Sequence, residues 1–461
     1  MLEVLSDRVY RRLFSAQVIA LFGTGLTTVA LSLLAYDLAG GSAGVVLGTA
    51  LALKMVAYVA IAPLVGAVAH RLPRRGLLAA LDIARAGVVL CLPVVEAVWQ
   101  VYLLIFLVNA LAAGFTPLFQ ATIPDVLREE ARYTRALSLS RLAYDLENLL
   151  SPSAAALALL VLTYDALFVA NAAAFLVSAL LVLSCRLPAA RAPERSGGFK
   201  EALGFGLTIH LRTPRLNGLL ALSLAVSAAG AMTIVNTVVL VRGGLGGGES
   251  ETALLFAAAG AGSMLLALAA PKLLERWSDR RVMLAGGALL AAGLAAGAGA
   301  ASAGALGYGA LGAIWFALGA GASMVQTPAG RLLRRSAREG DRPALFAAQF
   351  ALSHLCWLAA YPLAGWLGAA AGPAVAFAVL GAVAGGAAAA AARLWPANEP
   401  EALTHRHGAV AHEHLHVHDA HHQHAHEGWE GPEPHSHPHR HAPIRHTHPL
   451  VIDLHHPVWP R

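Results

Sequence analysis

The stretch "GAVAHRLPRRGLL", residues 66–78, is a short basic hinge between two long apolar segments. A helix needs about 20 mostly apolar residues to cross a bilayer, and the segments on both sides of the hinge are that long. Of the 461 residues in the chain, 57% are hydrophobic and only 13% are charged. A soluble domain has about 25% charged residues. We therefore interpret the stretch as a connection between two transmembrane helices of a membrane protein.

Apolar runs of the same kind, separated by short polar hinges, continue up to residue 396. They predict an all-α, polytopic membrane protein with 12 transmembrane helices. The first run leads directly into the second without a small-residue cleavage site, so we expect no removable signal peptide. The runs lie near residues 13–38, 43–69, 77–97, 100–122, 138–163, 165–186, 215–241, 251–274, 282–302, 305–328, 343–368 and 373–395.

Arginine and lysine are concentrated in alternate hinges. They occur in the N-terminal arm, at residues 71–75, before the fifth run, in the central linker and in the corresponding hinges of the second half. The hinges between these are nearly free of positive charge, with Arg242 as the exception. Because positive loops stay in the cytoplasm, we expect both termini to be cytoplasmic. The net charge of +6 is thus divided among separate loops, and we expect no nucleic-acid partner.

The chain also contains an internal repeat. Arg74 and Arg75 have counterparts in Arg280 and Arg281, and "QATIPDVLR" (residues 120–128) aligns with "QTPAGRLLR" (residues 326–334), each 206 residues later. Parallel repeats of this size place the substrate path between the two halves. The predicted division is residues 1–186 for the first six-helix half, 187–214 for a cytoplasmic linker, 215–396 for the second half and 397–461 for a histidine-rich tail.

The basic hinge resembles the signature of the major facilitator superfamily, G-x-x-x-D-R-x-G-R-R. Gly66, Arg71, Arg74 and Arg75 match it, whereas His70 stands at the aspartate and a proline replaces the second glycine. The resemblance implies that this hinge gates the cytoplasmic side through a charge relay. The missing carboxylate puts the partner of these arginines in question.

The first apolar run, "RRLFSAQVIALFGTGLTTVALSLLAYDL", and "LDIARA" in the third resemble the exporter branch that includes enterobactin and drug effluxers. Within that branch, the histidine tail makes the chain most similar to the nickel-resistance permeases. The resemblance implies a proton-coupled exporter in the inner (plasma) membrane of a prokaryote, and we expect a monomer.

Polar residues in the fifth run are candidates for the transport path or for coupling, because a charge at the bilayer centre costs about 2.5–3.5 kcal/mol. Asp145 and Asn148 are three residues apart and share a helical face. Glu147 points elsewhere, towards Ser151. The alternative for Asp145 is a local ion pair with Arg141, four residues earlier.

Two further candidates lie on other runs. His354 follows Asn148 by 206 residues and has Cys356 close by, so it can contribute to a transient divalent-cation site. Cys356 can equally be a small packing residue. Lys54 is a proton-linked switch, a barrier to cations, or the structural partner of a carboxylate on a facing helix.

The tail holds most of the histidines, mainly in His-x-His spacing, and few large apolar residues. Such a segment is expected to be disordered without metal. In an extended chain alternate side chains share a side, so neighbouring histidines can chelate one ion. Imidazole suits Ni²⁺, Co²⁺ and Zn²⁺, and an accessory metal-binding role is expected, with a pH sensor as the alternative. The candidate ligands are His405, His407, His412, His414, His416, His418, His421, His422, His424, His426, His435, His437, His439, His441, His446 and His448.

No enzyme motif stands out, and there is no G-x-x-x-x-G-K-[ST] loop for ATP. The function predicted is proton-coupled export of a divalent transition metal, nickel before cobalt or zinc, with no required cofactor. Two alternatives remain open. One is export of a drug or siderophore-like molecule with a tail that only buffers or senses metal, and the other is a membrane-anchored metal store or sensor.

Overall fold

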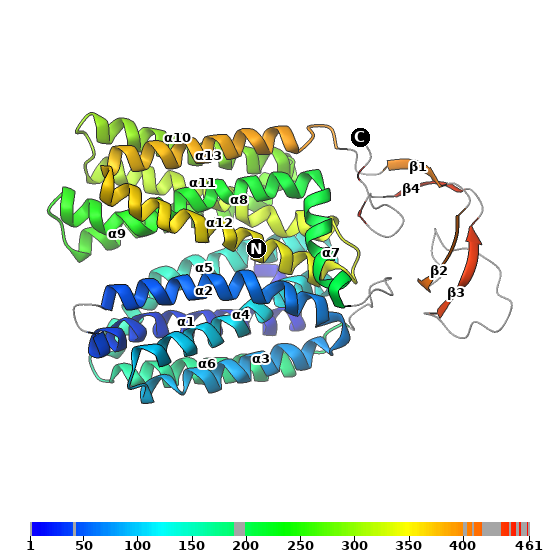
Figure 1. The fold of residues 1–461 in the computed structure, drawn as a ribbon, viewed down its shortest axis with the longest axis horizontal. Coiled ribbons are helices and arrows are strands. Elements are labelled where there is room, and N and C mark those ends of the chain that lie inside the picture. Colours follow the sequence, from blue (N-terminus) through cyan, green and yellow to red (C-terminus); the bar gives the residue numbers. More distant parts are fainter. Residues whose placement is uncertain are drawn as a thin grey trace.

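In the computed structural model, long helices lie side by side in two bundles, one above the other in Figure 1. The structure describes residues 2–39, 43–188, 199–399, 403–407, 410–416, 435–441, 444–448, 451–452 and 459. The first bundle contains η1 (Leu2–Ser6), α1 (Arg8–Ala39), α2 (Ala43–Val68), η3 (Ala69–Arg71), α3 (Arg74–Val89), η4 (Leu92–Val94), α4 (Val98–Val126), α5 (Glu130–Ala158) and α6 (Tyr164–Leu183). The second contains α8 (Pro214–Val239), η5 (Leu240–Gly244), α9 (Glu249–Arg276), α10 (Asp279–Ser302), α11 (Tyr308–Arg335), α12 (Arg342–Ala370) and α13 (Gly372–Leu394).

Eleven helices in the described part of the chain are long and apolar enough to cross a membrane. The other long helix of the bundles is α5, whose 29 residues carry several charges, among them Arg141, Asp145 and Glu147. This helix packs against α9 and α11 of the second bundle as well as against α1. Its polar residues are tolerated because this face meets protein rather than lipid. On the other side of the molecule, α12 packs against α2 and α4.

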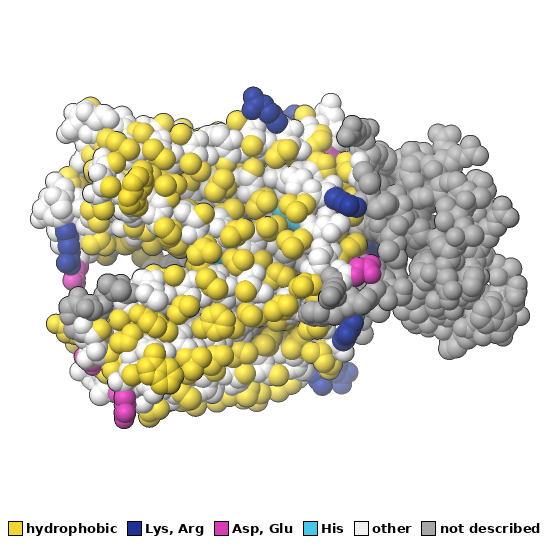
Figure 2. All heavy atoms as spheres, viewed as in Figure 1, with side chains coloured by type: hydrophobic (Ala, Val, Ile, Leu, Met, Phe, Trp, Pro, Cys, Tyr) yellow, Lys and Arg dark blue, Asp and Glu magenta, His cyan; other side chains and the backbone are white. Residues whose placement is uncertain are grey.

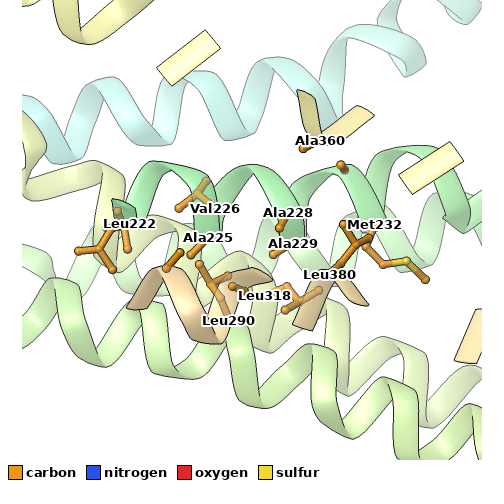
Figure 3. Packing of buried hydrophobic residues seen from close by; sticks show 14 of the residues in the cluster. Leu222, Ala225, Val226, Ala228, Ala229, Met232, Leu290, Leu318, Ala360 and Leu380 are labelled. Atoms are coloured by element: carbon orange, nitrogen blue, oxygen red, sulfur yellow. The ribbon is translucent and has the colours of Figure 1, made fainter. Parts of the chain in front are cut away.

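Small residues allow the helices of the second bundle to pack closely. Figure 3 shows Ala225, Ala228 and Ala229 of α8 among larger side chains such as Leu290 and Leu380 from neighbouring helices. Between α9 and α11, a methyl group on Gly319 would overlap the backbone oxygen of Ala259. Lipid provides no hydrophobic force between helices, so close van der Waals packing of this kind contributes directly to the stability of a membrane bundle.

The two bundles meet at one end and are separated at the other. Hydrophobic side chains cover the flank in Figure 2, and the view shows a hollow between the bundles at its left end. At the right end, where α5 and α12 begin, ion pairs such as Arg342–Asp125 and Arg331–Glu130 join the bundles. We call this the closed end and the opposite one the open end.

A short helix, α7 (Phe199–Arg212), lies across the closed end between the two bundles (Figure 1). It packs against α2, α8 and α12. Gly206 allows this approach, because a side chain there would overlap the backbone of Ala344 on α12.

The tail differs from the prediction of disorder in four short segments. Strand β1 (Leu403–His407) pairs with β4 (Ile444–His448), and β2 (Val410–His416) pairs with β3 (His435–His441), both antiparallel. The His-x-His alternation has the period of a strand, which favours extended pairing. The register places His412 opposite His439, His414 opposite His437 and His416 opposite His435. The candidate ligands His418, His421, His422, His424 and His426 lie outside the described residues.

Candidate transport path and gate

The basic hinge occupies the closed end, between α2 and α3. Gly66 lies against α12, where a Cβ atom would be 3.3 Å from the backbone oxygen of Pro343 and closer still to Ala347. His70 and Arg71 form η3, and the side chains of Arg71 and Arg75 are exposed. Arg74 is the first residue of α3 and is buried. The glycine of the signature is therefore needed for the approach of α2 to α12, while Arg74 carries the buried charge.

Asp125, at the end of α4, supplies the carboxylate that the hinge itself lacks. Its Oδ2 accepts a hydrogen bond from Nη1 of Arg74, and its Oδ1 accepts one from Nη1 of Arg342, 2.5 Å away at the start of α12. The side chains are only 3% exposed for Arg74, 9% for Asp125 and 12% for Arg342. One carboxylate thus joins an arginine of its own half to an arginine of the other half. These three residues form the first charge cluster of the gate.

A second cluster is built in the same way, but its central residue is an arginine instead of a carboxylate. Arg331, at the end of α11, is 2.6 Å from Oε1 of Glu130 at the start of α5 and 3.2 Å from Oδ1 of Asp279 at the start of α10. Asp279 is also 3.3 Å from Arg335. Arg331 follows Asp125 by 206 residues, the period of the internal repeat. Here one arginine joins a carboxylate of its own half to a carboxylate of the other half.

Closer to the open end, Tyr58 brings Lys54 and His354 together. Lys54 on α2 lies over the Tyr58 ring, with Nζ 5.7 Å from the ring centre. The His354 ring of α12 meets Tyr58 edge-on at 4.7 Å, and its Nδ1 lies 2.7 Å from the backbone oxygen of Phe350. Lys54 also interacts electrostatically with His354 and with Glu147 of α5. Three of the candidate residues therefore share one region between the halves.

The remaining candidates of α5 point elsewhere. Asp145 pairs with Arg141 at 2.9 Å, as in the local alternative, and also accepts a 2.7 Å hydrogen bond from Ser263 of α9. Arg141 donates to Ser263 and to Gln326 of α11. Asn148 is exposed and donates back to the Tyr144 carbonyl of its own helix. Asp145 thus links the two halves, whereas Asn148 does not join the Lys54 region.

The described residues contain no group of three or more histidine, cysteine, aspartate or glutamate side chains arranged to hold a metal ion. In particular, His354 and Cys356 are not joined by a carboxylate into such a group. The side chains of the tail histidines lie outside the described residues. A preformed metal site is therefore not a feature of the described membrane region.

Two paired bundles with a charged gate at one end and a polar region between them define a membrane transporter. The chain belongs to the Major Facilitator Superfamily, whose family profile matches residues 13–242 and 220–419. The curated proteins contain no match to the sequence.

Solved structures share the fold at low sequence identity. The human organic anion transporter MFSD10 (TETRAN) has a TM-score of 0.67 at 16% identity, with 83% of this chain and 99% of that chain covered. A bacterial homologue of the iron transporter ferroportin in an outward-facing state gives 0.68 at 13% identity, covering 84% and 99%. The proton:xylose symporter XylE, bound to 6-bromo-6-deoxy-D-glucose, gives 0.64 at 16% identity, covering 85% and 96%.

Proposed function

We propose that this transporter is a proton-coupled exporter of a divalent transition-metal cation, nickel before cobalt or zinc, that confers metal resistance. The observation that carries the proposal is the position of the histidines. All but three of the 21, namely His70, His210 and His354, follow residue 404. Imidazole is a borderline ligand that suits these ions. The fold neighbour described as a homologue of an iron transporter supports this substrate class through its architecture alone.

In this proposal the closed end, with its arginine-rich hinges, faces the cytosol of a prokaryote, and both termini lie on that side. The arrangement of the halves is then outward-open. The tail acts as a cytosolic metal-binding accessory near the closed gate. It binds metal next to the entrance without lying on the transport path.

Coupling is assigned to the region around Lys54, Glu147 and His354. A carboxylate can hold a proton or contribute to binding a cation, and the two uses compete at one site. Protonation of Glu147 from the open end removes its attraction for Lys54 and also weakens its hold on a metal ion. Release of the cation to the outside and uptake of a proton are then linked at the same carboxylate.

A second candidate is export of an organic molecule, with a tail that only buffers metal. It is favoured by the aromatic character of the same region, where Tyr58 packs against Phe350 at 5.0 Å and Trp357 against Tyr361 at 5.1 Å. The absence of a metal-binding group among the described residues also favours it.

The two candidates separate in growth tests. Cells that express the full chain, a chain ending at Ala397, His354→Ala or Glu147→Gln are grown on graded Ni²⁺, Co²⁺, Zn²⁺ and a panel of organic compounds. Metal tolerance that survives truncation but is lost in Glu147→Gln supports the proposal. Protection against an organic compound alone contradicts it. In inverted vesicles, metal uptake should collapse on addition of a protonophore, and uptake that persists would refute proton coupling.

A further inference from the structure

A cavity of about 200 Å³ lies at the closed end between the two charge clusters of the gate. Its mouth is open to water, since the side chains of Glu130 and Arg335 are 60% and 43% exposed. Both halves of the chain contribute to its wall. The lining residues are Glu130, Tyr133, Arg331, Arg334, Arg335 and Arg342.

The cavity has an excess of positive charge. The lining residues and the network of ion pairs connected to them, which extends through Asp125 to Arg74, comprise five arginines but only three carboxylates, those of Asp125, Glu130 and Asp279. Two positive charges are therefore not neutralised within the cluster. The Glu130 carboxylate lies at the mouth, but it is engaged by Arg331 at 2.6 Å.

Among the polar atoms of the wall that make no hydrogen bond in the described part of the chain, two belong to Tyr133 and Arg334. The hydroxyl of Tyr133, a residue with 0% exposure, makes no hydrogen bond. Nη1 of Arg334 is likewise buried and unpaired, although Nη2 of the same side chain donates to the backbone oxygen of Arg128. The Arg334 guanidinium lies over the Tyr133 ring, 5.4 Å from its centre. A buried donor without a partner destabilises the protein, so both groups favour a ligand that accepts hydrogen bonds.

We propose that this cavity binds a dianionic phosphate group, held by Arg334, Tyr133 and Arg342. Guanidinium groups match the geometry of phosphate oxygens and form strong, charge-assisted hydrogen bonds with them. The charge of such a group balances the excess of two, and the volume accommodates a tetrahedral oxyanion with several waters.

The bound group acts as a lock on the gate. It contacts α5 of the first half and α11 and α12 of the second half only while these helices are together. A ligand that binds one state more tightly shifts the population towards that state. Phosphate therefore stabilises the closed end and slows the alternation of the transporter, whatever its substrate.

The test uses the full chain in nanodiscs of zwitterionic lipid, with inorganic phosphate as the probe and chloride at matched ionic strength as the comparison. The measured quantities are the phosphate dissociation constant and the shift in Tm. Wild type should bind phosphate and gain thermal stability. Arg334→Gln and Tyr133→Phe should weaken binding about tenfold or more, which corresponds to about 1.4 kcal/mol. Arg242→Gln, at the open end, is the matched control and should bind as wild type does.

A further set of nanodiscs identifies the source of the phosphate group. If phosphatidic acid, whose headgroup is a phosphomonoester that can carry two negative charges, abolishes the response to added phosphate in wild type and stabilises Arg334→Gln less, a lipid headgroup occupies the cavity. If the response is unchanged, the ligand is free phosphate. Either result supports the site. Equal stabilisation by chloride, an unchanged response in both variants, or binding of an adventitious ion only, at molar concentration, would overturn it.

Discussion

The substitution Asp125→Asn removes the carboxylate that joins the halves at the closed end. Asp125 binds Arg74 of its own half and Arg342 of the other half. The contact with Arg74 lies within one half, so separation of the halves need not break it. The contact with Arg342 joins the two halves, and we expect it to be lost when they separate at this end. The effect of the substitution on the gate therefore depends on the second contact alone.

A hydrogen bond to a charged group contributes about 1.5–3 kcal/mol. The Arg342 and Asp125 side chains are 12% and 9% exposed, so solvent screens their contact little. We expect the substitution to reduce the preference for the closed gate by about 2 kcal/mol, which is about 30-fold in the equilibrium. Glu130→Gln should have a smaller effect, because Glu130 is 60% exposed and such pairs contribute about 1 kcal/mol or less.

The population of the two states is measured with spin labels at Leu72→Cys and Trp277→Cys. Both positions are exposed, at 45% and 50%, and lie in corresponding hinges of the two halves. The native Cys91, Cys185 and Cys356 are first replaced by serine. Asp125→Asn should move the distance distribution towards a longer separation. Arg242→Gln breaks an exposed pair within one half and should not. An Asp125→Asn distribution identical to that of the parent would refute the reasoning.

Three further predictions concern the linker helix, the second bundle and the coupling region. Burial lowers the pKa of His210, whose Nε2 is 2.6 Å from Gln349, from 6.5 to about 4. As the pH drops from 6.5 towards 4, His210 binds a proton in the unfolded state before it does so in the folded state. The free energy of unfolding should therefore fall by up to about 3 kcal/mol over this range. His210→Gln should remove that part of the pH dependence of Tm. Gly319→Ala should lower Tm, because overpacking costs about 1–3 kcal/mol, whereas Gly312→Ala on the same helix enters open space and should not. Lys54→Met and Glu147→Gln should show non-additive losses in proton-coupled uptake, and fully additive losses would argue against their interaction.

The helices and their repeat could be predicted from the sequence, because both depend on local composition and spacing. The gate could be predicted only in part. The hinge indicated Arg74, but its partner Asp125 lies 51 residues away, and Arg342 lies 217 residues from that aspartate. Contacts at such separations depend on the packing of whole helices. A signal was nevertheless present, because the repeat aligns Asp125 of "QATIPDVLR" with Arg331 of "QTPAGRLLR".

Candidate side chains within the bundles were harder to place. The sequence allowed Asp145 either a local ion pair with Arg141 or a place in the transport path. The structure contains the local ion pair. Asp145 also accepts a hydrogen bond from Ser263, which lies in the other half. Lys54 had no carboxylate on its own helix, and its neighbours Tyr58 and His354 meet only because α2 packs against α12. Which face of a helix meets which neighbour is a property of the assembled bundle.

The two clusters have central residues of opposite charge, Asp125 in the first and Arg331 in the second. This arrangement explains how the gate can open at a modest cost in free energy. When the halves separate at this end, Asp125 keeps Arg74 and Arg331 keeps Asp279, because each of these pairs lies within one half. Neither Asp125 nor Arg331 is then left as a buried charge without an ion-pair partner, which would cost about 3–5 kcal/mol. Among the ion pairs of the two clusters, only the cross-half contacts Arg342–Asp125 and Arg331–Glu130 are lost. Arg342 and Glu130 each begin a helix at the closed end, where water can replace the partner. Each cluster therefore has one ion pair that opening breaks, while the pairs within one half, Arg74–Asp125, Arg331–Asp279 and Arg335–Asp279, can persist.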